Sequence, residues 1–207
     1  AQLVRGIGSE SIDVRTRHAD FSNTAAAGKA RWLGRSVASL STLDRVLVIG
    51  SFLRKDHPLL AQRIRQAARK GAQVMSLNAV HDDWALPVAA TLTAAPGQWL
   101  SQLADVAAAV AKAAGVPAPL PADPGSHAQA VAAALASGQQ KAILLGNAAA
   151  QHPQAAQILA LANWIAQQTG ATVGYLGEAA NSVGAQLVNA VPGAGGLNAG
   201  QMLSQPM

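Results

Sequence analysis

The sequence predicts an α/β fold: a doubly wound, mainly parallel sheet built from two Rossmann-like βαβ units. Two continuous apolar runs, 46–49 and 142–145, fit strands that are covered on both faces, and a glycine closes each run. Each run is followed by a His-Pro pair, a helical apolar stripe, a glycine and a further apolar run. This repeated order indicates two similar units, the first at 44–115 and the second at 126–190.

The composition is that of a globular chain rich in alanine. Of the 207 residues, 50% are hydrophobic, 3% aromatic and 12% charged, which excludes a disordered chain. Because the chain has no cysteine, it holds no disulfide, thiolate metal site or iron–sulfur cluster. We find no signal peptide and no apolar run long enough to cross a bilayer. Since the sequence begins at Ala1 without an obvious terminal structure, we expect it to be a piece of a longer protein.

The N-terminal segment, residues 1–43, is the least regular part of the sequence. We expect a short strand at 3–7 and a short helix that carries Trp32, Leu33 and Val37 on one side. This helix would lead into the first unit.

The first unit begins with the strand at 46–49. Asp56 is expected to cap the following helix, which Pro58 helps to begin because proline fits the first helical turn. Gly71 ends this helix as a left-handed cap, and a second strand follows at 72–77. These elements form one βαβ unit.

Prolines and glycines mark the boundaries of the remaining segments. A short strand at 88–93 precedes a helix that ends at Gly115. Four prolines make 116–125 a linker or surface loop between the two units. A glycine-rich tail occupies 191–207.

The second unit opens with a helix in which Ser126 and Gln129 match a capping box. After the strand at 142–145, a longer helix ends at Gly170, and the last predicted strand is 171–176. The sequence therefore places one strand–helix–strand pattern in each half of the chain.

The positive charge is concentrated in one helix. The chain has a net charge of +5, and six of its fifteen basic residues fall within seventeen positions: Arg54, Lys55, Arg63, Arg65, Arg69 and Lys70. A solvated helix face explains this cluster most simply, and an interface with an acidic partner subunit is the sharper alternative. A nucleic acid partner is not expected, because no aromatic residue alternates with these basic residues.

Two loops are the candidate binding residues: Gly50 with Ser51, and Gly146 with Asn147. Both follow predicted parallel strands at their carboxyl ends, where open α/β sheets bind ligands. Neither loop contains GxGxxG or a P-loop, so neither carries a dinucleotide or triphosphate fingerprint. The alternative is that each glycine only permits a tight turn between strand and helix.

No catalytic or metal-binding residue is predicted. A nucleophile elbow, G-x-S-x-G, does not occur in the sequence. His57 and His152 each precede a proline at the start of a helix, and their places in separate units argue against a shared metal site. His81-Asp82-Asp83 is best interpreted as a solvated loop.

Several stretches occur in a characteristic order: GIGSESID at 6–13, the LVIG strand, the LLGN strand, ANSVGA at 180–185 and GLNA at 196–199. This ordered set resembles the C-terminal, molybdopterin-oxidoreductase-like region of one protein family. That family is the large iron–sulfur subunit of bacterial NADH:quinone oxidoreductase, respiratory complex I. The resemblance spans nearly the whole chain.

The resemblance implies a structural or interaction domain without a catalytic centre, in a parent complex that passes electrons from NADH to quinone. The family's iron–sulfur clusters are bound by cysteines of an N-terminal region, so no cofactor is expected in this chain. The partners would be other subunits of the complex, at the cytoplasmic side of the inner membrane and without membrane insertion. The alternative is a fragment of a molybdopterin-dependent oxidoreductase that binds a pterin dinucleotide. Such enzymes often have G-x-N-P after the first strand, whereas Ser51-Phe52-Leu53 follows Gly50 here.

Overall fold

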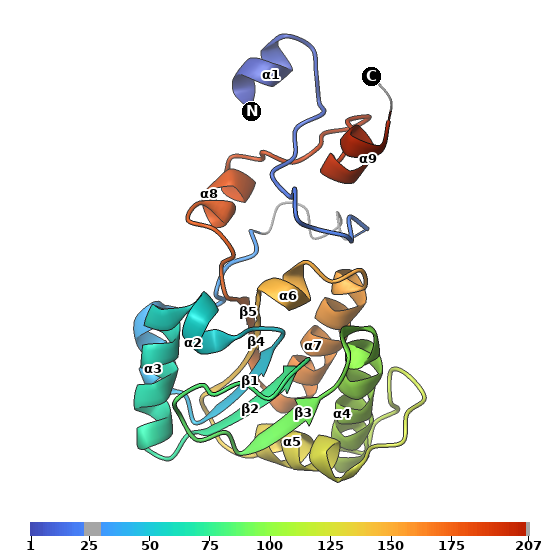
Figure 1. The fold of residues 1–207 in the computed structure, drawn as a ribbon. Coiled ribbons are helices and arrows are strands. Elements are labelled where there is room, and N and C mark those ends of the chain that lie inside the picture. Colours follow the sequence, from blue (N-terminus) through green and yellow to red (C-terminus); the bar gives the residue numbers. More distant parts are fainter. Residues whose placement is uncertain (23–29, 206–207) are drawn as a thin grey trace.

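The computed structural model describes residues 1–22 and 30–205, and its centre is a five-stranded parallel sheet (Figure 1). The strand order is β3-β2-β1-β4-β5. The strands are β1 (Arg45–Ile49), β2 (Gln73–Asn78), β3 (Ala90–Thr93), β4 (Lys141–Leu145) and β5 (Thr172–Tyr175). The predicted doubly wound α/β fold is confirmed, and both units contribute to the same sheet.

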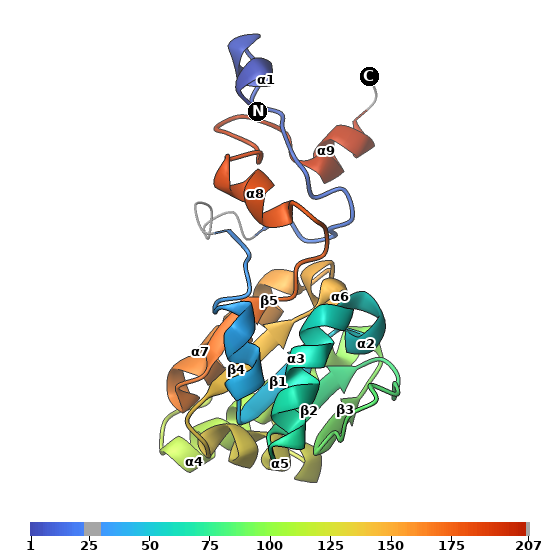
Figure 2. The same cartoon turned by 90° about the vertical axis from the view of Figure 1, so that its left-hand side faces the viewer.

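Helices cover both faces of this sheet (Figures 1 and 2). One face is covered by α3 (Pro58–Arg69) and the 3-10 helix η1 (Val37–Thr42), and the other by α4 (Trp99–Ala114), α5 (Ser126–Ala136) and α7 (Ala155–Thr169). Val46 and Val48 of β1 belong to the core beneath α3, whereas Leu47 and Ile49 belong to the core beneath α4 and α7. An apolar residue is therefore needed at each of these positions of the strand, which explains the continuous run.

The winding of the chain reverses between β1 and β4. From β1 the chain moves outward to β2 and β3, and it then returns to β4 and continues to β5 on the other side. β1 and β4 pair directly, with Arg45 opposite Lys141 and Ile49 opposite Leu145. Short helices follow the two strands: α2 (Leu53–Asp56) after β1 and α6 (Asn147–Ala150) after β4. The two candidate loops therefore lie at the topological switch point of the sheet.

Residues 1–22 and 177–205, here called the terminal layer, lie together beyond the carboxyl ends of the strands (Figures 1 and 2). The layer contains α1 (Gln2–Gly6), α8 (Ser182–Leu187) and α9 (Ala199–Ser204). Among the residues of these three helices only Ala199 is buried. Polar contacts hold the layer together, such as those from the Arg5 guanidinium to the carbonyls of Asn189 and Val191, at 3.0 and 3.1 Å.

Two predictions for the N-terminal segment are wrong. Residues 3–7 are not a strand, because they belong to α1 and its cap, where Ile7 N–H donates to the Leu3 carbonyl. A helical turn satisfies these backbone groups locally, whereas a strand needs a neighbour. Trp32 and Leu33 are not helical: Tyr175 N–H donates to the Trp32 carbonyl at 2.8 Å, so this segment runs along the edge of β5. Only Val37 of the predicted set lies in a helix, η1.

Both predicted N-terminal caps are also wrong. The residue before α3 is His57, and Asp56 instead lies in α2, where its carboxylate accepts from Phe52 N–H at 2.9 Å. α5 has Gly125 at its N-cap position, and the Gln129 side chain donates to the Pro124 carbonyl rather than closing a capping box.

The helix ends follow the predicted glycines more closely. α4 ends at Gly115 and α7 at Gly170, both left-handed, with φ of 68° and 74°. The η2 turn (Pro96–Gln98) leads into α4. Across the described ranges, no helix combines the length and the apolar character that crossing a membrane requires.

Candidate functional site

The two candidate loops are in direct contact at the switch point. Gly146 N–H donates to the Ile49 carbonyl at 2.8 Å, and Ala148 N–H donates to the Gly50 carbonyl at 3.0 Å. Gly50 has φ of +64°, and a Cβ on Gly146 would lie 2.5 Å from the Gly50 carbonyl oxygen. Both glycines are therefore required by the close approach of the two loops, as well as by the turns themselves.

Several polar groups of the first loop form hydrogen bonds within the chain. Ser51 is buried, and its Oγ lies 3.4 Å from a carboxylate oxygen of Asp56. The same oxygen accepts from Phe52 N–H. Asn78, at the end of β2, donates to the Ser51 carbonyl at 3.1 Å and to Asp82 at 2.8 Å. A carboxylate thus occupies the position where this loop would otherwise contact an anion.

The second loop retains one unsatisfied polar atom. Asn147 begins α6, and its buried Oδ1 has no hydrogen-bond partner among the described residues. Of the four candidate residues, this side chain alone offers a free buried acceptor. The structure brings all four candidate residues together, and three of them are committed to contacts between or within the loops.

The two histidines of the His-Pro pairs have different surroundings. His152 is buried, stacks on Trp99 with ring centroids 5.6 Å apart, and places Nε2 2.9 Å from the Pro96 carbonyl. His57 is buried with no described partner for Nε2, and burial lowers its pKa. Within residues 1–22 and 30–205, no three His, Asp or Glu side chains are grouped so as to hold a metal ion.

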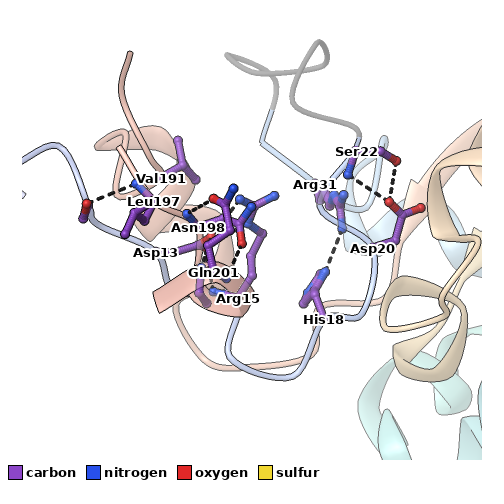
Figure 3. Close-up of polar contacts among 12 residues, drawn as sticks. Asp13, Arg15, His18, Asp20, Ser22, Arg31, Val191, Leu197, Asn198 and Gln201 are labelled. Carbon is purple, nitrogen blue, oxygen red and sulfur yellow. Dashed lines mark hydrogen bonds and ion pairs between the residues drawn. The ribbon is translucent and has the colours of Figure 1, made fainter. Parts of the chain in front are cut away.

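A second polar cluster joins the terminal layer to the sheet. His18 Nε2 lies 2.9 Å from a Glu178 carboxylate oxygen, and Gln151 Nε2 donates to the other oxygen at 2.9 Å. Arg31 Nη1 lies 3.2 Å from His18 Nδ1, as Figure 3 shows. The Arg31 guanidinium also lies 5.4 Å from the centre of the Tyr175 ring, at the end of β5.

Asp20 covers the start of α7. One of its carboxylate oxygens accepts from Ala156 N–H at 2.8 Å, in the first turn of that helix. The other accepts from Ser22 N–H at 2.9 Å (Figure 3). A carboxylate is favourable at the N-terminus of a helix, because it satisfies a free N–H and opposes the positive end of the dipole.

The third polar cluster lies inside the terminal layer (Figure 3). Asp13 forms a two-point ion pair with Arg15, with both nitrogen–oxygen distances at 2.8 Å, and also accepts from Ala199 N–H at 3.1 Å. The Asp13 side chain has no exposed surface. This contact connects the N-terminal segment to α9.

Sequence reasoning missed these clusters of the terminal segments. Asp13, His18 and Asp20 lie in an irregular segment without periodicity, and each has a partner more than 130 positions away along the chain. No local motif marks such pairs, since each forms only when the chain ends come together.

Acid is expected to loosen the contact between the terminal layer and the sheet. The hydrogen bond from His18 keeps the pKa of Glu178 below its usual range. Burial opposes the ionisation of Asp20, but hydrogen bonds from Ser22 and Ala156 outweigh it and lower its pKa. Groups with a lowered folded pKa stabilise the protein above the unfolded pKa, about 4, and this contribution is lost as the pH falls through the folded pKa.

Thermal unfolding measured from about pH 6 to about pH 3 would check this expectation. The Glu178→Gln variant should lose less stability over that range than the unmodified chain. An equal loss in both proteins would show that Glu178 does not contribute to the pH dependence.

Comparison with solved structures finds a likeness to a chain of the formyltransferase/hydrolase complex FhcABCD from Methylorubrum extorquens, solved with methylofuran. The TM-score is 0.53 at 17% identity, over 85% of this chain and 48% of that one, so the likeness concerns the fold alone. The chain thus spans about half the length of that neighbour.

A search of curated proteins finds no match. The family model for molybdopterin oxidoreductase, in contrast, matches residues 1–206, which include the sheet, both candidate loops and the terminal layer. The chain therefore belongs to the molybdopterin oxidoreductase family.

Proposed function

We propose that this chain is a structural and interaction domain of the large iron–sulfur subunit of NADH:quinone oxidoreductase, without a catalytic centre of its own. In this proposal the parent complex carries electrons from NADH to quinone. Its iron–sulfur clusters are bound outside these 207 residues, which contain no cysteine. The domain would lie at the cytoplasmic side of the inner membrane, in contact with other subunits.

The observation that carries this proposal is the self-contact of the loops at the switch point. A pterin dinucleotide has a diphosphate, which binds most readily to free N–H groups of glycine-rich loops. Here Phe52 N–H donates to the Asp56 carboxylate, and the N–H groups of Gly146 and Ala148 donate to backbone carbonyls. The Asp56 carboxylate would also repel a phosphate at this position.

Three helices at the same edge, α2, α6 and α7, do not favour an anion either. α2 and α6 have four residues each, too few to form a substantial dipole, and the start of α7 is already contacted by Asp20. These contacts support the proposal that no pterin dinucleotide binds at this edge, as does the missing Asn-Pro pair after Gly50.

The alternative function is a pterin-binding part of a molybdopterin-dependent oxidoreductase. Family membership favours it, as does the unsatisfied Oδ1 of Asn147 beside the candidate loops. The structural neighbour is a chain of a multi-subunit complex, which supports association with partners under either function.

Cofactor analysis of the purified chain would separate the two functions. We expect neither molybdenum nor pterin, because the N–H groups of Phe52, Gly146 and Ala148 already donate within the chain. Elemental analysis would measure molybdenum, and the fluorescence of oxidised pterin would measure the pterin. A stoichiometric amount of either would contradict the proposal and support the alternative.

Removal of residues 1–207 from the parent subunit provides the second readout. Incorporation of the subunit into the membrane complex should fall by about tenfold or more, while turnover per assembled complex stays near normal. Complete assembly would show that the domain is not needed for interaction. Loss of turnover in an assembled complex would show that it takes part in catalysis.

A further inference from the structure

One face of the molecule carries the whole net charge of the chain. It is formed by α2, α3 and the residue after α3, and we call it the cationic face: Arg54, Lys55, Arg63, Arg65, Arg69 and Lys70. Asp56 is the one acidic residue of this segment, so its net charge is +5, equal to that of the entire chain. Acidic and basic residues are therefore equal in number elsewhere.

The fold leaves most of these cations without partners. The Arg54 side chain pairs with Asp83 at 3.2 Å, and the side chains of the other five make no hydrogen bond or ion pair with any described residue. In the rest of the described chain, most arginines are engaged: Arg5, Arg15, Arg31, Arg35 and Arg45 all contact side chains or carbonyls. Residues 23–29 contain no acidic residue that could pair with the cationic face.

Helix stability does not account for the cations. The buried stripe of α3 consists of Ala61, Ile64, Ala67 and Ala68, and no acidic residue occurs along its exposed side. Arg65 and Arg69 are like charges four positions apart, which destabilises the helix rather than supporting it. Only the cations at the end of the helix gain from the dipole.

The outward side of α3 combines charge with an apolar residue. Arg63 lies four positions after Leu59 and Lys70 seven positions after Arg63, so the three share one side of the helix. Leu59 is 81% exposed, while Arg63 and Lys70 are both exposed. In Figure 2 this helix lies on the side turned to the viewer, away from the terminal layer.

We propose that the cationic face is a docking surface for an acidic surface of a partner protein, with Leu59 as an apolar contact within it. The proposal rests on the proposed function and names the chemistry of the partner subunit. Opposite charges steer the encounter and set the register, while a desolvated leucine contributes to the strength of binding. A protein partner is favoured over nucleic acid, because the face has no aromatic residue for base stacking.

The test compares two double variants of the full-length parent subunit that change net charge equally. Arg63→Glu with Lys70→Glu reverses the cationic face, and Arg17→Glu with Lys112→Glu reverses two exposed cations elsewhere. We expect the first variant to assemble about tenfold less well, with the loss greater at low salt, and the second to assemble normally. Thermal unfolding of the isolated chain should be the same for both.

A photoreactive residue at Gln62, on the exposed side of α3, identifies the contacted segment of the partner. That segment should be rich in Asp and Glu, and exchanging two of them for Lys should restore assembly with Arg63→Glu/Lys70→Glu. Normal assembly of Arg63→Glu/Lys70→Glu, or equal assembly of the two double variants, would overturn the docking proposal. The role of the domain in assembly would still be decided by removal of residues 1–207. If Arg63→Glu/Lys70→Glu assembles normally but loses binding to duplex DNA or to phosphatidylglycerol vesicles, the proposal is overturned in favour of that partner.

Discussion

Substitution of Gly146 by alanine is expected to destabilise the chain by about 3 kcal/mol, a large effect for the addition of one methyl group. The new Cβ would lie 2.5 Å from the Gly50 carbonyl oxygen, which is a steric clash with a backbone atom. The loops have little room to separate, because Gly146 N–H and Ala148 N–H hold them to the end of β1 and to Gly50. Relief of the overlap would require the loss of one of these hydrogen bonds.

Urea unfolding of Gly146→Ala and of Gly97→Ala would measure this effect. Gly97 is a matched control, since a Cβ there meets no atom within 4 Å and its φ is not positive. We expect the control to change the free energy of unfolding by less than about 0.5 kcal/mol. Equal stability of the two variants would contradict the close contact of the loops at the switch point.

Substitution of Asp13 by alanine is expected to detach the N-terminal segment from α9. The local stability of the terminal layer should fall by about 3–5 kcal/mol. The Asp13 side chain is fully buried, and its removal leaves the buried Arg15 guanidinium without its counter-ion. The N–H of Ala199, in the first turn of α9, also loses its acceptor. The remaining contact of Arg15, 5.0 Å above the Phe21 ring, is too weak to compensate.

Hydrogen exchange resolved by segment would measure this release. Exchange should accelerate in 9–22 and in α9, while β1 and β4 retain the protection of the unmodified chain. Asp123→Ala, which removes an exposed carboxylate, provides the control. Faster exchange throughout the sheet would show that the layer and the sheet unfold together, and unchanged exchange would show that the ion pair is dispensable.

The two predictions concern different parts of the proposed function. The loop contact concerns the room for a ligand at the carboxyl edge of the sheet, and the Asp13 contact concerns the connection between the N-terminal segment and α9 inside the terminal layer. Both are independent of the cationic face, which lies on α2 and α3.

The sequence by itself determined the sheet and the helices that cover it. Strands β1 and β4 are apolar at each core position because both of their faces are buried, and such a run is recognisable without neighbours. The ends of α4 and α7 could also be predicted from the sequence, because Gly115 and Gly170 adopt a left-handed conformation that other residues avoid. These properties depend on a few adjacent residues and can therefore be predicted from short stretches of the sequence.

Only the tertiary structure decided what the loops and chain ends contact. Gly50 and Gly146 meet because β1 and β4 are neighbours, which follows from the paths of the connections rather than from either loop. His18 and Glu178 are 160 positions apart, and Asp20 reaches a helix 136 positions away. The wrong strand at 3–7 has the same origin. Its backbone groups needed a partner strand to form a ladder, and the described part of the fold provides none beside it, so a local helical turn satisfies them instead.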